Sequence, residues 1–169
     1  MLDMTVAANV DGHKFDVFAE LPDGTYRFED FIDNDGIVDT PIPVRLAITI
    51  AGDHMHFDFS GTGPKARGPL NMSRNTTLSS CFVAIKHIFP DVPVNGGTFR
   101  PISIHVPAGT LLAAEYPSPC GGYLDPMGRV IDVVFGALSQ VLPDLLARRI
   151  MSPTPTTFKY ADGRSPNDS

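Results

Sequence analysis

Hydrophobic and polar residues alternate in the first half of the chain, as they do in strands that bury one face. The clearest case is a predicted β-hairpin that turns at Ala51–Asp53 and runs from about residue 44 to residue 59. Its apolar positions are Val44, Leu46, Ile48, Ile50, Met55, Phe57 and Phe59. The same alternation predicts further strands at residues 24–31 and 102–106.

The period changes twice to that of a helix. From about Asn75 to Phe89 the apolar residues recur three or four positions apart, and Pro90 ends the pattern. A second helical stripe extends to about Pro143. Asp125 is expected to be its N-cap, with Pro126 at the first helical position.

These elements predict an α+β fold with an antiparallel or mixed sheet of short strands and two main helices. The 16 prolines and 15 glycines among 169 residues fall mainly between the elements, so the fold is expected to be rich in loops. We expect a flexible N-terminus (1–13), a single domain (14–149) and an extended tail (150–169).

Composition removes several functional classes. The net charge is −6 and the chain has no basic run, which argues against nucleic acid as a partner. No apolar stretch approaches the roughly 20 residues that span a bilayer. The two cysteines, Cys81 and Cys120, lack the spacing of a disulfide framework or a zinc finger, which favours a reducing, cytoplasmic setting.

The most distinctive candidate site is the glycine-rich stretch DFSGTGPKARGPLN, residues 58–71. Its free main-chain N–H groups precede the first helix, where the helix field favours an anion or a substrate amide oxygen. The alternative is a crossing loop that needs glycine only for its turns. The candidate binding residues here are Ser60, Gly61, Thr62, Arg67 and Asn71.

Two other loops supply candidates. Asn95 and Gly96 form a tight-turn signal before Arg100, which can bind an oxygen anion with two hydrogen bonds or act as a buried structural tie. Gly121 and Gly122 form a turn before the second helix. We include all five residues among the candidate binding positions. We identify no catalytic residue.

A weaker candidate lies on the predicted hairpin. His54, His56 and Asp58 share one face of a strand, and two histidines with a carboxylate can hold a divalent metal. Strand alternation alone also predicts polar residues at these positions, as the solvent face opposite Met55 and Phe57. The second interpretation is preferred, and no metal site is assigned.

Three ordered blocks resemble the hydantoinase B/oxoprolinase family over about residues 21–142. They are DFSGTGPKARGPLN, VPVNGGTFRPISIHVPAGTLL and GGYLDPMGRVIDVVFGALSQVLPD. Members of this family are partner subunits of ATP-dependent cyclic-amide hydrolases, and acetone and acetophenone carboxylases are relatives. The resemblance includes Gly121 and Gly122.

The resemblance implies an internal fragment of a B-type subunit that acts in ATP-dependent hydrolysis of a hydantoin or 5-oxoproline. The alternative is a non-catalytic module of an ATP-dependent ketone carboxylase complex. The expected partners are a hydantoinase A-type nucleotide-binding subunit, a small-molecule substrate and, if apolar surface is left exposed, a second copy of the chain. We expect ATP and a divalent metal in the complete complex, no cofactor on this segment, and no activity from the isolated chain.

Overall fold

The computed structural model describes residues 9–10, 13–14, 18, 21–90, 92, 94 and 98–143. Within them lie six β-strands, two α-helices and one short 3-10 helix. In chain order they are β1 (Asn9–Val10), β2 (His13–Lys14), β3 (Gly24–Ile32), β4 (Ile42–Ala51), β5 (His54–Asp58), α1 (Arg74–Ile88), β6 (Ile102–His105), η2 (Leu111–Ala113) and α2 (Leu124–Leu138).

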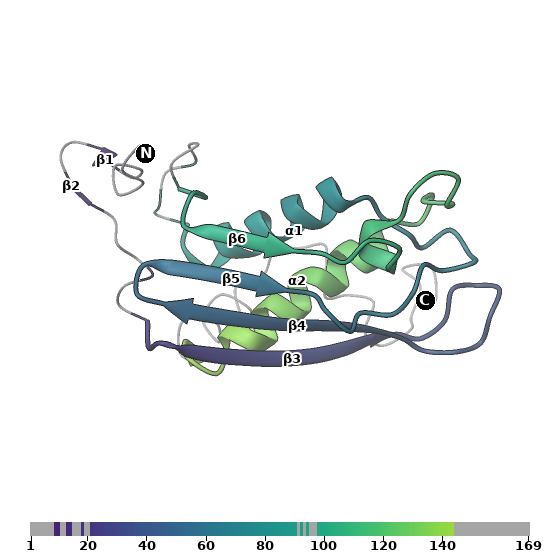
Figure 1. Ribbon diagram of the computed structural model, residues 1–169, viewed down its shortest axis with the longest axis horizontal. Coiled ribbons are helices and arrows are strands. Elements are labelled where there is room, and N and C mark those ends of the chain that lie inside the picture. Colours follow the sequence, from purple (N-terminus) through teal and green to yellow (C-terminus); the bar gives the residue numbers. More distant parts are fainter. Residues whose placement is uncertain are drawn as a thin grey trace, which may run out of the picture.

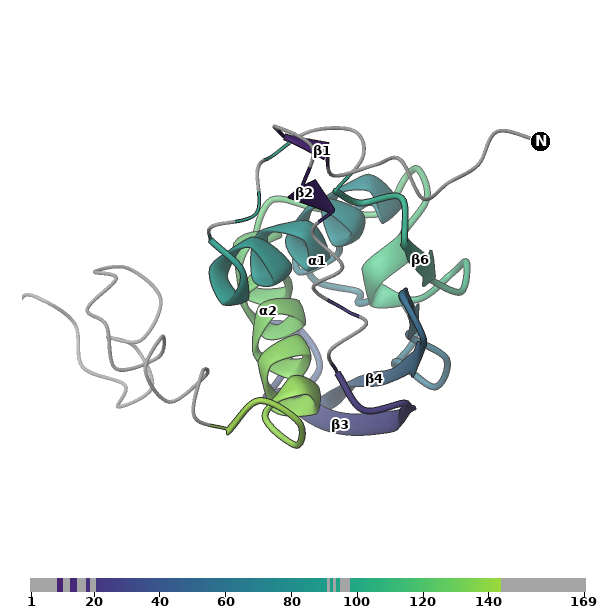
Figure 2. The ribbon, with the colours of Figure 1, turned by 90° about the vertical axis from the view of Figure 1, so that its left-hand side faces the viewer.

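Four of the strands form one mixed sheet with the order β3-β4-β5-β6 (Figure 1). The β3–β4 and β4–β5 pairs are antiparallel, whereas β5 and β6 run parallel, with Met55 opposite Ile102 and Asp58 opposite His105. Both α-helices lie on the same face of this sheet (Figures 1 and 2). The α+β prediction, with its mixed sheet and two main helices, is confirmed.

The predicted hairpin is confirmed as β4 and β5. Val44, Leu46 and Ile48 on β4 are buried, and Ile48 pairs with Phe57 of β5. The turn between the strands places Gly52 at φ +58°, in the left-handed region that favours glycine. Alternation therefore identified both the strand pair and the face that it buries.

Helix α1 begins one residue before the predicted start. The hydroxyl of Ser73 caps it by accepting a hydrogen bond from the amide of Thr76, at 3.2 Å. The helix ends at Ile88, just before Phe89 and Pro90, as its apolar pattern predicts.

The predicted start of the second helix is wrong. Helix α2 begins at Leu124 with Tyr123 as its N-cap, so Asp125 and Pro126 are the second and third helical residues. Proline is tolerated there because the first four N–H groups of a helix have no acceptor within the helix. Asp125 still lies in the first turn, where a negative charge is favourable.

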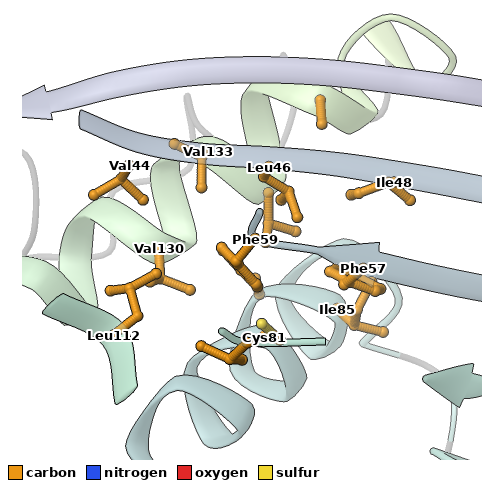
Figure 3. Packing of buried hydrophobic residues seen from close by; sticks show 14 of the residues in the cluster. Val44, Leu46, Ile48, Phe57, Phe59, Cys81, Ile85, Leu112, Val130 and Val133 are labelled. Carbon is orange, nitrogen blue, oxygen red and sulfur yellow. The ribbon is translucent and has the colours of Figure 1, made fainter. Parts of the chain in front are cut away.

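The hydrophobic core fills the space between the sheet and the two helices (Figure 3). Phe57 and Phe59 of the sheet side meet Cys81 of α1 and Val130 of α2, and all four are fully buried. Burial raises the pKa of the Cys81 thiol to about 12, so it remains protonated.

Helix α2 also approaches β3 closely. A Cβ atom on Gly136 would lie 2.5 Å from the ring of Phe28, so a larger residue here would force that ring to move. Arg129 adds an ion pair to Asp30 of β3, with a distance of 2.5 Å from Nη1 to Oδ2. These contacts hold α2 against the edge of the sheet.

The predicted flexible N-terminus falls mainly outside the described residues, apart from β1 and β2, which pair with each other. The predicted tail (150–169) lies wholly outside them. No helix among the described residues is long and apolar enough to cross a membrane.

Candidate functional site

Three loops meet at one end of the sheet, on the right-hand side of Figure 1. They connect β3 to β4, β5 to α1, and β6 to α2. We call this surface the three-loop end; it comprises residues 33–41, 59–73 and 106–123. All the predicted site residues from Ser60 to Asn71, together with Gly121 and Gly122, belong to it.

The start of the β5–α1 loop is fastened to β4. The hydroxyl of Thr62 accepts a hydrogen bond from the amide of Arg45 and donates one to the carbonyl of Arg45, each at 3.2 Å. Gly61 has φ +87°, and its carbonyl accepts a hydrogen bond from the Arg45 guanidinium at 3.1 Å. The Thr62 hydroxyl thus makes the two hydrogen bonds with Arg45 that a residue of an adjacent strand would make. These bonds fix the direction in which the loop leaves the sheet.

The middle of the same loop is held by the side chain of Asn71, which is fully buried. Its Oδ1 accepts a hydrogen bond from the amide of Ala66 at 2.7 Å. Its Nδ2 donates to the carbonyls of Ala66, Gly68 and Pro119, at distances from 2.9 to 3.2 Å. Both amide hydrogens of Asn71 are therefore directed at main-chain carbonyls, and its side chain joins two of the three loops.

Asp35 joins the β3–β4 loop to the β5–α1 loop, a role that the sequence did not reveal. The residue is 3% exposed, and its carboxylate accepts four main-chain hydrogen bonds. Oδ1 accepts from Ile37 and Val38, and Oδ2 accepts from Arg67 and Gly68, at 2.6–3.0 Å. These hydrogen bonds, led by that of Val38, hold the pKa of Asp35 well below its usual range, so the buried group stays ionised.

The glycine turn before α2 packs against the β5–α1 loop. The amide of Gly122 donates to the carbonyl of Pro69 at 2.8 Å, and a Cβ on Gly122 would lie 2.7 Å from the Leu70 side chain. Gly121 has more room, since the nearest atom to an added Cβ is 3.8 Å away, on Pro69. The structure therefore brings the predicted 60–71 and 121–122 positions together.

Exposed groups on this fixed scaffold are of two kinds. The side chains of Ser60 and Arg67 face solvent, and the Arg67 guanidinium has no hydrogen-bond or ion-pair partner among the described residues. Large apolar side chains are also exposed, with Ile37 62% exposed, Leu124, beside the end of the third loop, 65%, and Tyr116 99%. An exposed cation can bind an anionic group, and the apolar side chains can pack against another polypeptide.

Arg100 lies at the opposite end of the sheet. It precedes β6, whose start is held to the start of β5 by the hydrogen bond from the Met55 amide to the Pro101 carbonyl, at 3.0 Å. The Arg100 side chain is exposed, so the interpretation of Arg100 as a buried tie is wrong. The neighbouring candidates Asn95 and Gly96 lie outside the described residues.

The candidate metal residues share the solvent face of β5. His54 contacts Asp53, and His56 contacts Ser103, with Nδ1–oxygen distances of 2.5 and 2.7 Å. Hydrogen bonds from Ser60, from its hydroxyl first, lower the pKa of Asp58. No group of three or more histidine, cysteine or acidic side chains in the described part of the chain is arranged to hold a metal ion. The described residues thus do not fit a metal centre.

Comparison with known proteins places these features in context. The profile of the Hydantoinase B/oxoprolinase family matches residues 9–166. The B-type subunit of a putative D-/L-hydantoinase from Pseudomonas sp. (strain NS671) is 30% identical over 142 residues, which are 76% of this chain and 24% of that protein. The chain therefore spans about a quarter of the length of this relative.

Two solved structures have a similar fold. The ATP-dependent caprolactamase from Pseudomonas jessenii superposes with a TM-score of 0.67 at 26% sequence identity, covering 75% of this chain and 22% of that one. The nucleotide-free structure of acetone carboxylase gives a TM-score of 0.63 at 19% identity, covering 75% of this chain and 18% of that one. At that identity the second comparison concerns the fold alone.

Proposed function

Because the chain belongs to the hydantoinase B/oxoprolinase family, we propose that it acts as a segment of a B-type subunit in ATP-dependent hydrolysis of a cyclic amide, of the hydantoin or 5-oxoproline type. The observation that carries this proposal is the family match over residues 9–166. The similarity to an ATP-dependent caprolactamase supports it, since a lactam is also a cyclic amide.

Within such an assembly, we assign the three-loop end to substrate or subunit contact. Arg67 is the residue most suited to hold an oxygen anion, because its guanidinium is exposed while Asp35 fixes its main chain. Ser60, which is exposed in the same loop, adds a hydroxyl group. The side chains of Thr62 and Asn71 position the loop through hydrogen bonds to main-chain groups. Gly61 allows its turn, and Gly121 and Gly122 allow the close contact of the neighbouring loop.

The proposal requires other polypeptide. A hydantoinase A-type subunit would bind ATP and activate the amide, and any divalent metal would be held outside the described residues. Arg100 would belong to a separate contact surface, since it lies at the other end of the sheet. We propose that the assembly works in the cytoplasm and that this chain alone does not turn over substrate.

A chimera tests the proposal. Residues 21–142 replace the matching segment in the B-type subunit of the Pseudomonas hydantoinase, and the chimera is purified with its A-type partner. We expect ATP-dependent ring opening of hydantoin or 5-oxoproline, measured as the ring-opened acid and as ADP. A folded chimera that co-purifies with the partner but opens neither ring would contradict the proposed hydrolysis.

That negative result would favour the alternative, a non-catalytic interaction module of a carboxylase-like complex. The exposed Ile37, Tyr116 and Leu124 favour this second function, because apolar groups gathered at one end of a domain suit packing against another chain. In this case replacing Leu124 with Ser in the chimera would weaken co-purification without changing the chimera's own unfolding temperature.

A further inference from the structure

Strand β3 forms one edge of the sheet, and no other strand of the described residues pairs with its outer side. Its nine residues pair with β4 in continuous register, from Gly24 opposite Ile50 to Ile32 opposite Ile42. The strand contains neither proline nor lysine, and the register has no bulge. Proline, lysine and bulges are among the means by which an edge strand avoids pairing with another strand. Charged side chains are another, and β3 carries Arg27, Glu29 and Asp30.

Two side-chain contacts show which N–H and C=O groups of β3 point away from β4. Gln140 donates to the carbonyl of Arg27 at 2.9 Å from outside the sheet. The amide of Phe31 donates to the carboxylate of Asp30 at 2.8 Å, also away from β4. The N–H and C=O groups of successive residues in a strand point to alternate sides. Those of Thr25, Arg27, Glu29 and Phe31 therefore point outward, away from β4.

Most of these outward groups have no partner in the described part of the chain. The main-chain groups of Thr25 and Glu29 form no hydrogen bond there, and neither does the amide of Arg27. The carbonyl of Arg27 accepts from Gln140 but has a second lone pair. Another strand can therefore pair with this edge if the Phe31 amide exchanges the Asp30 carboxylate for a main-chain acceptor and the Arg27 carbonyl accepts a second hydrogen bond beside that of Gln140.

Arg27 and Glu29 give β3 opposite charges two positions apart, and the Glu29 carboxylate also contacts the Arg45 guanidinium of β4. We infer that β3 pairs antiparallel with β3 of a second copy, about a two-fold axis at Phe28. This register places Arg27 opposite Glu29 of the second copy, and Glu29 opposite its Arg27. The outward N–H and C=O groups of these residues, and those of Thr25 and Phe31, then face each other across the two strands. Opposite charges directly across an antiparallel pair are stabilising, and like charges are destabilising.

The same register covers exposed aromatic surface. Phe28 lies on the helix side of β3, opposite Leu46, and is 40% exposed. At the two-fold axis its ring meets the same ring of the second copy, and Phe31, 41% exposed, lies beside Thr25 of that copy. This dimer goes beyond the proposed function, which it neither requires nor excludes.

Charge reversal gives a test that does not depend on activity. Arg27→Glu alone and Glu29→Arg alone each place like charges opposite one another in both symmetric pairs. Because Glu29→Arg also replaces the ion pair of Glu29 with Arg45 by two like charges, the unfolding temperature of both variants is measured alongside. Sedimentation equilibrium is expected to show a wild-type dimer and self-association that is weaker by about tenfold or more in each variant. Mixing the two variants restores both ion pairs, so a heterodimer of Arg27→Glu with Glu29→Arg is expected.

A monomeric wild-type chain, or a dimer that Arg27→Glu leaves unchanged, would overturn the inference.

Cross-linking tests the register independently of the charges. In a Cys120→Ser background, Phe28→Cys is expected to oxidise to a covalent dimer, since residues opposite each other at this position have Cα atoms about 4.5 Å apart. Tyr26→Cys is the control, because its two copies would be separated by four residues along the strand, roughly 13 Å. The proposed register would be overturned if both variants cross-linked equally or if neither cross-linked.

Discussion

The main-chain oxygen of Asp35 lies so close to Gly68 that a Cβ atom on residue 68 would be 1.7 Å from it. The Asp35 carboxylate also accepts the amide hydrogen of Gly68, at 3.0 Å. These two contacts press the β3–β4 loop against the β5–α1 loop. The arrangement of the three-loop end therefore depends on a residue with no side chain at position 68.

Gly68→Ala is expected to destabilise the fold by at least ~2 kcal/mol, because the atom that blocks the new methyl group belongs to main chain and cannot rotate away. Gly121→Ala in the neighbouring loop is the matched control, with its nearest neighbour at 3.8 Å, and is expected to change stability by less than ~1 kcal/mol. Urea unfolding at neutral pH measures both. Equal losses in the two variants would contradict the close contact.

Asp35→Asn is expected to remove part of the acid sensitivity of folding. The folded-state pKa of Asp35 is depressed, so the stability it contributes is complete above the unfolded pKa of about 3.9 and is lost as pH falls below it. The free energy of unfolding should therefore decrease less steeply in the variant than in the wild type between about pH 5 and pH 3. Identical slopes in urea titrations over this interval would show that Asp35 is not held ionised.

Asn71→Ala is expected to cost roughly 3 kcal/mol or more, because several main-chain groups lose their buried partner at once. Asn75→Ala is the control, since Asn75 is an exposed residue in the first turn of α1 and is expected to be nearly neutral. Thermal unfolding followed by circular dichroism gives the comparison. A small loss for Asn71→Ala would mean that the loops are held by other contacts.

The sequence predicted the elements whose signals are local. Alternation predicted the β4–β5 hairpin because the polarity of each residue on a strand indicates which face it occupies. The three-to-four spacing of apolar residues predicted α1 to within one residue of its start. The start of α2 was misplaced because Asp125–Pro126 is a good local start signal. A helix can nevertheless accept proline in its first turn.

The long-range contacts of the candidate site were not predictable in this way. Asp35 stands in the turn sequence DNDG, where it has the same local signal as Asp33, and its second set of partners lies more than 30 residues away. Likewise, no local pattern shows that Arg100 and the 60–71 loop lie at opposite ends of the parallel β5–β6 pair. The positions of Asp35 and Arg100 relative to the site are known only from the structure.

The most direct test of the account compares Arg67→Ala with Lys65→Ala in the active chimera. Both side chains are exposed cations of the same loop, so their loss changes the net charge equally. We predict that Arg67→Ala lowers the rate of ATP-dependent ring opening by about tenfold or more, with an unchanged unfolding temperature, whereas Lys65→Ala keeps the rate within about twofold. Equal rates in the two variants would contradict the assignment of the three-loop end as the functional surface.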